Sequence, residues 1–273
     1  MTFDLHRFTH GATRLAYEDL DFDTFASQPL DRATLRCLRY MHDVEYHTAC
    51  YLRDLLVTPA HADPAVTAFL SVWGYEEFWH GEALAAVLAA HGEPHGAERV
   101  ETVRSGLGWR DRLRPIAMAV GGWCAGEEIV ALQMAWGALN EATTQAGYQL
   151  LGATAGHRVL GELVRRISRQ EAMHLGFYMS EARRRLAASA RARRITRFAL
   201  DRLWRPVGSG LMADIETAFL RRHLLVGPVA REKMERIDRR MDSLPGLSGL
   251  ALATRSLEPS GPPGAAALRQ RAA

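Results

Sequence analysis

The amino-acid sequence predicts an all-α protein, and three observations support this fold class. Leu, Ala, Arg and Glu are abundant among the 273 residues, whereas β-branched runs bounded by turn formers are scarce. Apolar residues recur at alternating steps of four and three along several long segments, which is the spacing of one helix face. Short stretches rich in Pro or Gly, such as "TPAHADP" and "GATAG", separate these segments.

These patterns predict an arm, a set of main helices, some further helices and a tail. Residues 1–30 have weak periodicity, so we expect an N-terminal arm with one short helix. After the main helices, which end at about residue 188, two or three further helices should lead to about residue 240. The Pro-, Gly- and Ala-rich end predicts a disordered tail over 241–273, which leaves 31–240 as one helical bundle with added helices. The main helices are predicted over about 31–57, 64–91, 100–152 with a break at Gly121-Gly122, and 157–188.

Composition argues against several classes of protein. Cys37, Cys50 and Cys124 form no CxxC pair, and an odd number argues against a disulfide framework. The chain does not open with a basic region followed by an apolar segment, and its uncharged stretches are too short to span a bilayer. We therefore expect a cytoplasmic protein that contacts no membrane. Neither interleaved aromatic residues nor a known motif indicates nucleic-acid binding, although the net charge is +3.

Two of the apolar stripes are interrupted by a carboxylate and an imidazole. In "EEFWHGEAL" Glu77 and His80 fall on the stripe of the second predicted helix, and in "RQEAMH" Glu171 and His174 fall on that of the fourth. Residues three apart on a helix share a face, so the Glu and His of each motif can reach a common point. Burial of such groups is unfavourable unless they are paired, which predicts a partner at both places.

Each motif has a matching carboxylate on the preceding helix. Glu45 precedes Glu77 by 32 residues and Glu141 precedes Glu171 by 30, with a turn about midway in both cases. At about 1.5 Å per residue, an antiparallel hairpin brings each pair level. Glu127 is a rival on the third helix, but it would lie roughly 16–18 Å away along the axis, so Glu141 is preferred. We interpret Glu127 as a polar group near the bundle end or as a solvated one.

The repeated, level set predicts a carboxylate-bridged site for two metal ions in a ferritin-like four-helix bundle with additional C-terminal helices. Oxygen and nitrogen ligands without thiolates suit two iron ions, with manganese as the alternative, rather than structural zinc. A polar network or a water-filled crevice without metal is the competing interpretation. The predicted metal ligands are Glu45, Glu77, His80, Glu141, Glu171 and His174.

The four ligand segments together follow a known pattern. "EEFWHGEAL" has both acids, the His and the Gly of an "EENRHGDLL" helix, and "VEYHTACY", "NEATT" and "RQEAMH" match the other three ligand helices. On these motifs the chain resembles the acyl-acyl carrier protein desaturases over about residues 31–190. The resemblance implies a di-iron centre that activates O2, with Glu77 and Glu171 bridging the metals and the other four ligands terminal. It also places Thr144 beside the metals as a proton relay, the alternative being a hydroxyl bonded to its own helix carbonyl.

Two positions depart from that pattern. Gln170 stands where desaturases commonly have an Asp that belongs to an outer network around the metals, and such partners tune the metal. Ile167 stands where the related aryl-amine N-oxygenases place an additional His ligand, which argues against that branch. Tyr148 and Tyr178 should face inward near the site, and we favour packing over hydrogen bonding for both.

We therefore expect a di-iron oxidase that performs an O2-dependent two-electron oxidation, a desaturation or a hydroxylation, of an acyl or related organic substrate. The metal ions would take the part of an organic cofactor. The resemblance implies an acyl carrier protein as partner and an electron donor such as ferredoxin, and we expect a homodimer. A basic face would suit an acidic carrier, although mere solvation also explains it. It comprises Arg183, Arg184, Arg185, Arg191, Arg193, Arg194 and Arg197.

Three other functions compete with this expectation. One is a non-enzymatic ferritin-like protein that handles iron or peroxide, and another is an N-oxygenase-type di-iron enzyme. The third is a carrier-binding helical module that holds no metal. About eighty residues beyond a minimal four-helix bundle weigh weakly against the first, since the added helices can cover a substrate pocket.

Overall fold

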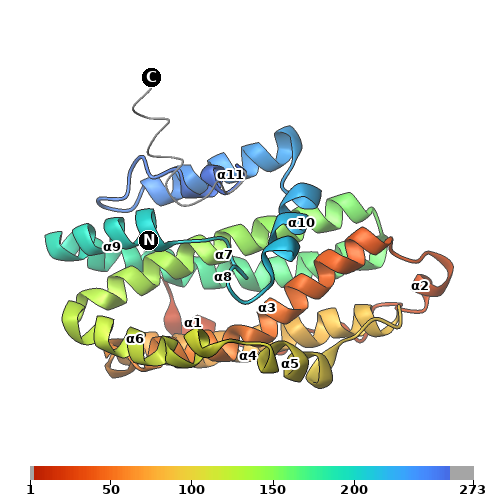
Figure 1. Ribbon diagram of the computed structural model, residues 1–273, viewed down its shortest axis with the longest axis horizontal. Helices are drawn as coiled ribbons and strands as arrows, with labels where there is room; N and C mark the ends of the chain where they lie inside the picture. Colours follow the sequence, from red (N-terminus) through yellow and green to blue (C-terminus); the bar gives the residue numbers. More distant parts are fainter. Residues whose placement is uncertain (1–2, 259–273) are drawn as a thin grey trace.

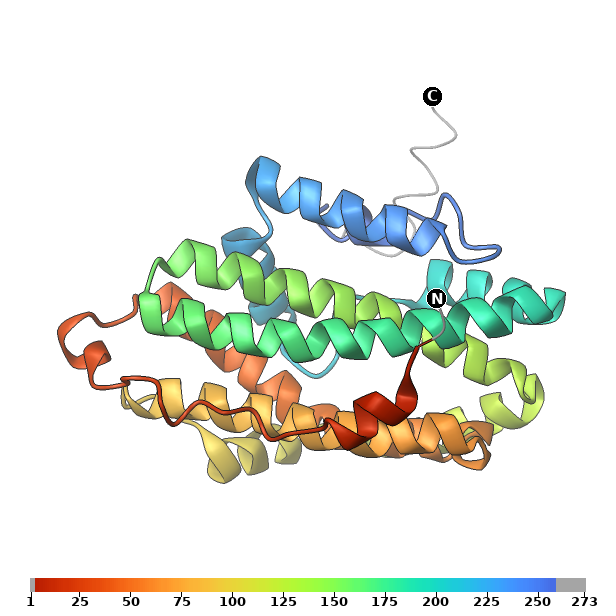
Figure 2. The same ribbon diagram turned by 180° about the vertical axis from the view of Figure 1, so that it is seen from behind.

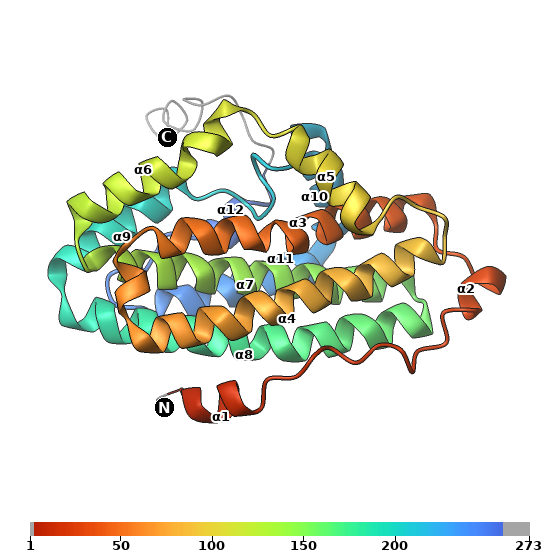
Figure 3. The same ribbon diagram turned by 90° about the horizontal axis from the view of Figure 1, so that it is seen from below.

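The computed structural model describes residues 3–258. The regular elements of this part of the chain are all helices. It contains no β-strand, only a single isolated bridge between Ser209 and Met212. The predicted all-α class is therefore confirmed. Four long helices run side by side (Figures 1 and 3). They are α3 (Arg32–Leu56), α4 (Pro64–Ala89), α7 (Glu128–Ala155) and α8 (Arg158–Ala188).

These helices form two antiparallel hairpins, because each pair is joined by a short, well-specified turn. Asp31 accepts hydrogen bonds from two backbone N–H groups at the start of α3, and Asp63 does the same for α4, where Pro64 occupies the first turn. The α3–α4 connection contains a short 3-10 helix, η1 (Pro59–Ala62). Gly156 ends α7 in the left-handed region at φ 61°, a conformation that glycine adopts without strain.

The two hairpins pack against each other through α4 with α8 and α3 with α7. Their buried apolar side chains form two clusters, one at each end of the bundle. The first includes Phe69 of α4 and Leu186 of α8, and the second includes Leu38 of α3 and Leu84 of α4. The residues predicted as metal ligands lie between these clusters, so the bundle has a polar layer within an otherwise apolar core.

Further helices lie between and after the hairpins. α5 (Gly96–Ser105) and α6 (Trp109–Ala125) connect α4 to α7, and α6 continues through Gly121-Gly122, where the sequence predicted a break. The chain turns instead at Gly126, whose φ of 66° favours glycine over other residues. The C-terminal helices are α9 (Ala190–Leu203), α10 (Asp214–Leu224), α11 (Gly227–Asp242) and α12 (Leu252–Arg255). The first three contact α7 (Figure 1), and α12 packs on α11.

The N-terminal arm and residues 241–258 pack more closely than expected. The N-terminal arm holds two short helices, α1 (Leu5–His10) and α2 (Thr24–Ser27), and it runs along the outside of the bundle (Figure 2). Residues 241–258 are not a disordered tail, because Leu244, Leu247 and Leu250 are buried in the core. The rest of the predicted tail, 259–273, lies outside the described residues. No described helix combines the length and the apolar character needed to cross a membrane.

Candidate metal centre

Six buried side chains from the four long helices meet at the middle of the bundle, and they are the six that the sequence predicts. None of them is more than 6% exposed. They form two groups of four, in each of which one ligand atom per residue lies within 4.8 Å of the others. Glu77 and Glu171 belong to both groups. The first group adds Glu45 and His80, and the second adds Glu141 and His174.

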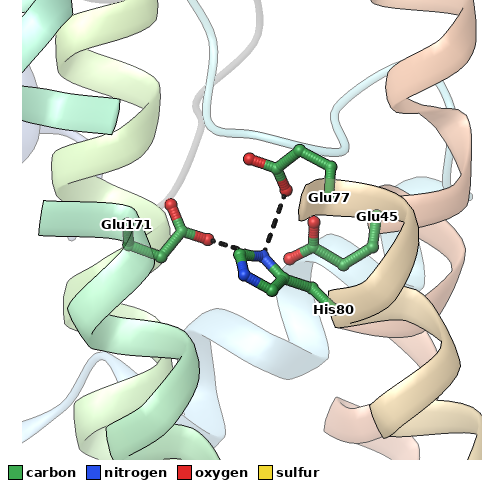
Figure 4. A group of neighbouring side chains, drawn as sticks. All are labelled: Glu45, Glu77, His80 and Glu171. Carbon is green, nitrogen blue, oxygen red and sulfur yellow. Dashed lines mark ion pairs between the residues drawn. The ribbon is translucent and has the colours of Figure 1, made fainter. Parts of the chain in front are cut away.

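The side chains of each group point toward a common centre. Figure 4 shows Glu45 from α3, Glu77 and His80 from α4 and Glu171 from α8 converging on one another. His80 Nδ1 lies 3.4 Å from Glu77 Oε2 and 3.5 Å from Glu171 Oε1. In the second group, His174 Nδ1 lies 3.2 Å from a Glu77 oxygen and 3.6 Å from a Glu171 oxygen.

Several atoms at the centre are buried and make no hydrogen bond among the described residues. They are Nδ1 of His80, Nδ1 of His174 and both carboxylate oxygens of Glu171. Native proteins rarely leave such atoms without a partner, because desolvation is then uncompensated. Two ligand atoms that each lie about 2.1 Å from the same cation are about 3.0–3.4 Å apart. The distances between Nδ1 and the carboxylate oxygens of this centre are close to that range. The arrangement therefore fits cations better than an internal hydrogen-bond network.

The outer nitrogen of each imidazole is held by the helix that carries the other motif. His174 Nε2 lies 2.7 Å from Glu76 Oε2, and His80 Nε2 lies 3.0 Å from Gln170 Oε1. The Gln170 amide nitrogen in turn donates to Glu76 Oε1 at 3.2 Å and to the Thr13 carbonyl at 3.0 Å. These contacts place a proton on each Nε2 and turn each Nδ1 toward the centre, as expected for metal-binding histidines.

Sequence reasoning did not assign this role to Glu76. A signal was present, since Glu76 and Gln170 each stand immediately before a shared glutamate, in equivalent places of the two motifs. The spacing does not reveal that each of these residues bonds the histidine of the other motif rather than that of its own. One partner is a carboxylate and the other an amide, so the two halves of the centre differ in charge.

The two unshared glutamates are each bonded by a buried aromatic donor. Trp73 Nε1 donates to Glu141 Oε1 at 3.0 Å, and the Tyr148 hydroxyl donates to Glu45 Oε1. For Tyr148 the favoured packing interpretation was therefore wrong. Tyr178 packs, with its ring edge toward Trp73 at a centroid distance of 6.1 Å. Each bond occupies one carboxylate oxygen and leaves the second for the centre.

The pKa values in the cluster reflect burial and mutual repulsion. Burial, together with the neighbouring carboxylates, raises the pKa of Glu45 and of Glu141 well above the usual range. Burial opposes protonation of His80, but the contacts with Glu171 and Glu77 raise its pKa to about 9. His174 is likewise surrounded by carboxylates, which outweigh its burial and raise its pKa. The centre thus attracts positive charge, as protons or as metal ions.

Thr144 is half-buried on α7, one turn after Glu141. Its hydroxyl makes no hydrogen bond within the described chain, whereas the neighbouring Thr143 bonds the carbonyls of its own helix. Thr144 and Glu45 both line a cavity of about 80 Å³, whose other walls are mostly apolar and include Met41 and Met234. The cavity lies between α3, α7 and the C-terminal segments, so the added helices form one of its walls.

Two other predicted features are Glu127 and the basic face of arginines. Glu127 is exposed at the start of α7, which settles its interpretation as a solvated group. Several arginines of the basic face bond the chain itself, including Arg185 to Asp63, Arg193 to a carbonyl of α8 and Arg197 to two carbonyls of the 246–248 turn. The face therefore supports an acidic carrier less strongly than its composition suggested.

Comparisons with protein-family models, with curated proteins and with solved structures give no match for this chain. The function is accordingly inferred from the site itself.

Proposed function

We propose that this protein is a ferritin-like di-iron oxidase, which uses O2 for the two-electron oxidation of an acyl or related organic substrate. The observation that carries the proposal is the pair of four-residue groups sharing Glu77 and Glu171. Two shared carboxylates between two His/Glu sets are the donor pattern of carboxylate-bridged metal pairs in four-helix bundles. Manganese is the alternative metal, because oxygen and imidazole ligands suit both ions.

In this proposal, Glu45 and His80 would hold one metal ion, Glu141 and His174 would hold the second, and the two shared glutamates would serve as ligands of both. When bound, the ions would supply the chemistry that reduces O2, with two electrons from an external donor. A hydroxylation then balances as RH + O2 + two electrons + two protons giving ROH + H2O, and a desaturation gives an alkene and two H2O. The chain's own residues position the ligands, exclude water and deliver protons.

The cavity beside Glu45 favours an enzyme over an iron-handling protein. An apolar space against one carboxylate of the centre can receive part of a carbon chain and keep water away from it. Thr144 has an unbonded hydroxyl in the same wall and is the proposed proton relay. Apart from Glu45, the residues that line the cavity carry no charge, which suits a neutral apolar segment of the substrate, with any charged group remaining outside.

The test is anaerobic loading with two equivalents of Fe(II), followed by O2, a reductant and a fatty acid or its carrier-protein thioester. Loss of two hydrogens or gain of one oxygen, detected by mass spectrometry, supports the proposal. Glu171→Gln should abolish both iron retention and product, whereas Glu127→Gln, on the same kind of residue at an exposed position, should preserve both. Iron that is oxidised while every substrate stays unchanged would instead indicate iron handling.

A further inference from the structure

The two histidines of the centre are supported by different kinds of partner. His174 Nε2 donates to the Glu76 carboxylate at 2.7 Å, whereas His80 Nε2 donates to the Gln170 side-chain oxygen at 3.0 Å. The orientation of the Gln170 amide is fixed, because its nitrogen faces two acceptors, Glu76 Oε1 and the Thr13 carbonyl. The outer network therefore contains one carboxylate, and this carboxylate bonds His174 directly.

In their other contacts the two halves of the centre are alike. The His174 half includes Glu141, the His80 half includes Glu45, and two further glutamates belong to both halves. Each unshared glutamate accepts one hydrogen bond from an aromatic side chain, an indole in the His174 half and a phenol in the His80 half. The partner of the imidazole is therefore the feature in which the two halves differ in charge.

A carboxylate partner makes an imidazole a stronger metal ligand than an amide partner does. A hydrogen bond to an ionised acceptor is shorter and about twice as strong as one between neutral groups, in keeping with 2.7 Å against 3.0 Å. It draws the Nε2 proton toward the acceptor and leaves more electron density on the Nδ1 that faces the centre. The negative charge also attracts a cation across a buried layer, where water screens it little.

We infer that the two halves bind metal ions in a fixed order, in which the His174 half fills first and the His80 half fills second and more weakly. Glu76 and Gln170 are the positioning residues that set this order, each acting through the imidazole that it bonds. The inference rests on the proposed metal centre and adds to it the inequality of its halves. Outer partners change metal affinity about 10–100-fold, so the two dissociation constants should differ by about this factor.

This order concerns the cavity, because the weaker half borders it. Among the described residues that line the cavity, Glu45 is the only one of the six ligands, and Thr144 lies in the same wall. The ion held by the His80 half would thus be both the more easily exchanged of the two and the one next to the space assigned to the substrate.

The test is a titration of the full chain with Mn(II) in the absence of O2, in which electron paramagnetic resonance measures the free ion. For the wild type we expect two dissociation constants that differ about 10–100-fold beyond the statistical factor for two equal sites. Glu76→Gln should weaken the first binding step by about this factor and leave the second nearly unchanged. Glu127→Gln is the matched control at an exposed position and should alter neither step.

An exchange of the two outer residues tests which half fills first. The double variant Glu76→Gln/Gln170→Glu keeps one carboxylate and one amide but reverses their places. In crystals prepared with one equivalent of Mn(II), anomalous scattering should lie at the His174 half in the wild type and at the His80 half in the double variant.

Two results would overturn the inference and leave the metal centre itself intact. One is equal occupancy of both halves by a single equivalent of Mn(II) in the wild type, and the other is an unchanged order of filling in the double variant. A wild type that binds no Mn(II) and no Fe(II) would contradict the proposed function, and the inference with it.

Discussion

Metal binding to the buried centre should release protons, and their number follows from the charges that the bundle can tolerate. Glu77 and Glu171 are buried, which alone would raise their pKa values, but contacts with the neighbouring carboxyl groups and imidazoles lower both. The assignment that follows these directions has these two ionised, both histidines protonated and the other two glutamates neutral, so the metal-free cluster would have zero net charge and four displaceable protons. Two divalent ions on four carboxylates and two neutral imidazoles also sum to zero. We therefore expect about four protons released per two ions at pH 7.

The sign of the pH dependence is fixed by the raised pKa values. Protons compete with metal ions, so affinity should rise with pH until the pKa of His80, about 9, is passed, and should fall as the solution is acidified. Calorimetric titration of Mn(II) in buffers of different ionisation enthalpy gives the proton count directly. Glu141→Gln should release about one proton fewer, whereas Glu127→Gln should match the wild type. A release of fewer than two protons would refute the assigned charges.

Three further predictions test the support of the centre, a close contact and the thiols. Trp73→Phe leaves a buried carboxylate oxygen without its donor, so metal affinity measured against a chelator should fall about 10–100-fold, and an unchanged affinity would contradict the role. Gly137→Ala places a Cβ 2.3 Å from a buried tyrosine ring and should cost about 1–3 kcal/mol in urea unfolding; Gly161→Ala, which meets nothing within 4 Å, should not. Burial raises the pKa of the Cys37 thiol to about 12, so at pH 8 a thiol reagent should label exposed Cys124 quickly and Cys37 only after unfolding.

The ligand positions were predictable from sequence because they depend only on regular helix geometry. A carboxylate on a helix face and a turn midway between two motifs fix both the direction and the depth of a side chain, which is how Glu141 was preferred to Glu127. The structure places these two residues accordingly, one in the cluster and one in solvent. The helix bounds around Glu45 and His80 were also close, since strong caps mark them.

Features that depend on neighbouring helices were not predictable in the same way. The bond from Tyr148 to Glu45 and that from Gln170 to His80 join different helices, and a stripe does not specify which helix lies opposite. The break expected at Gly121-Gly122 failed for a related reason, since Gly122 serves close packing on the α3–α4 turn rather than a bend.

The sharing of Glu77 and Glu171 ties the two hairpins into one functional unit. Each hairpin contributes three side chains to one of the two groups, and one of these three also belongs to the other group. Neither hairpin alone therefore completes a four-residue group. Two copies of a single hairpin, however, would together supply four carboxylates and two imidazoles. The chain is in this chemical sense a covalently joined pair of like halves, and its asymmetry lies in what surrounds them: an amide at Gln170 in place of a second Glu76, and an apolar cavity beside Glu45.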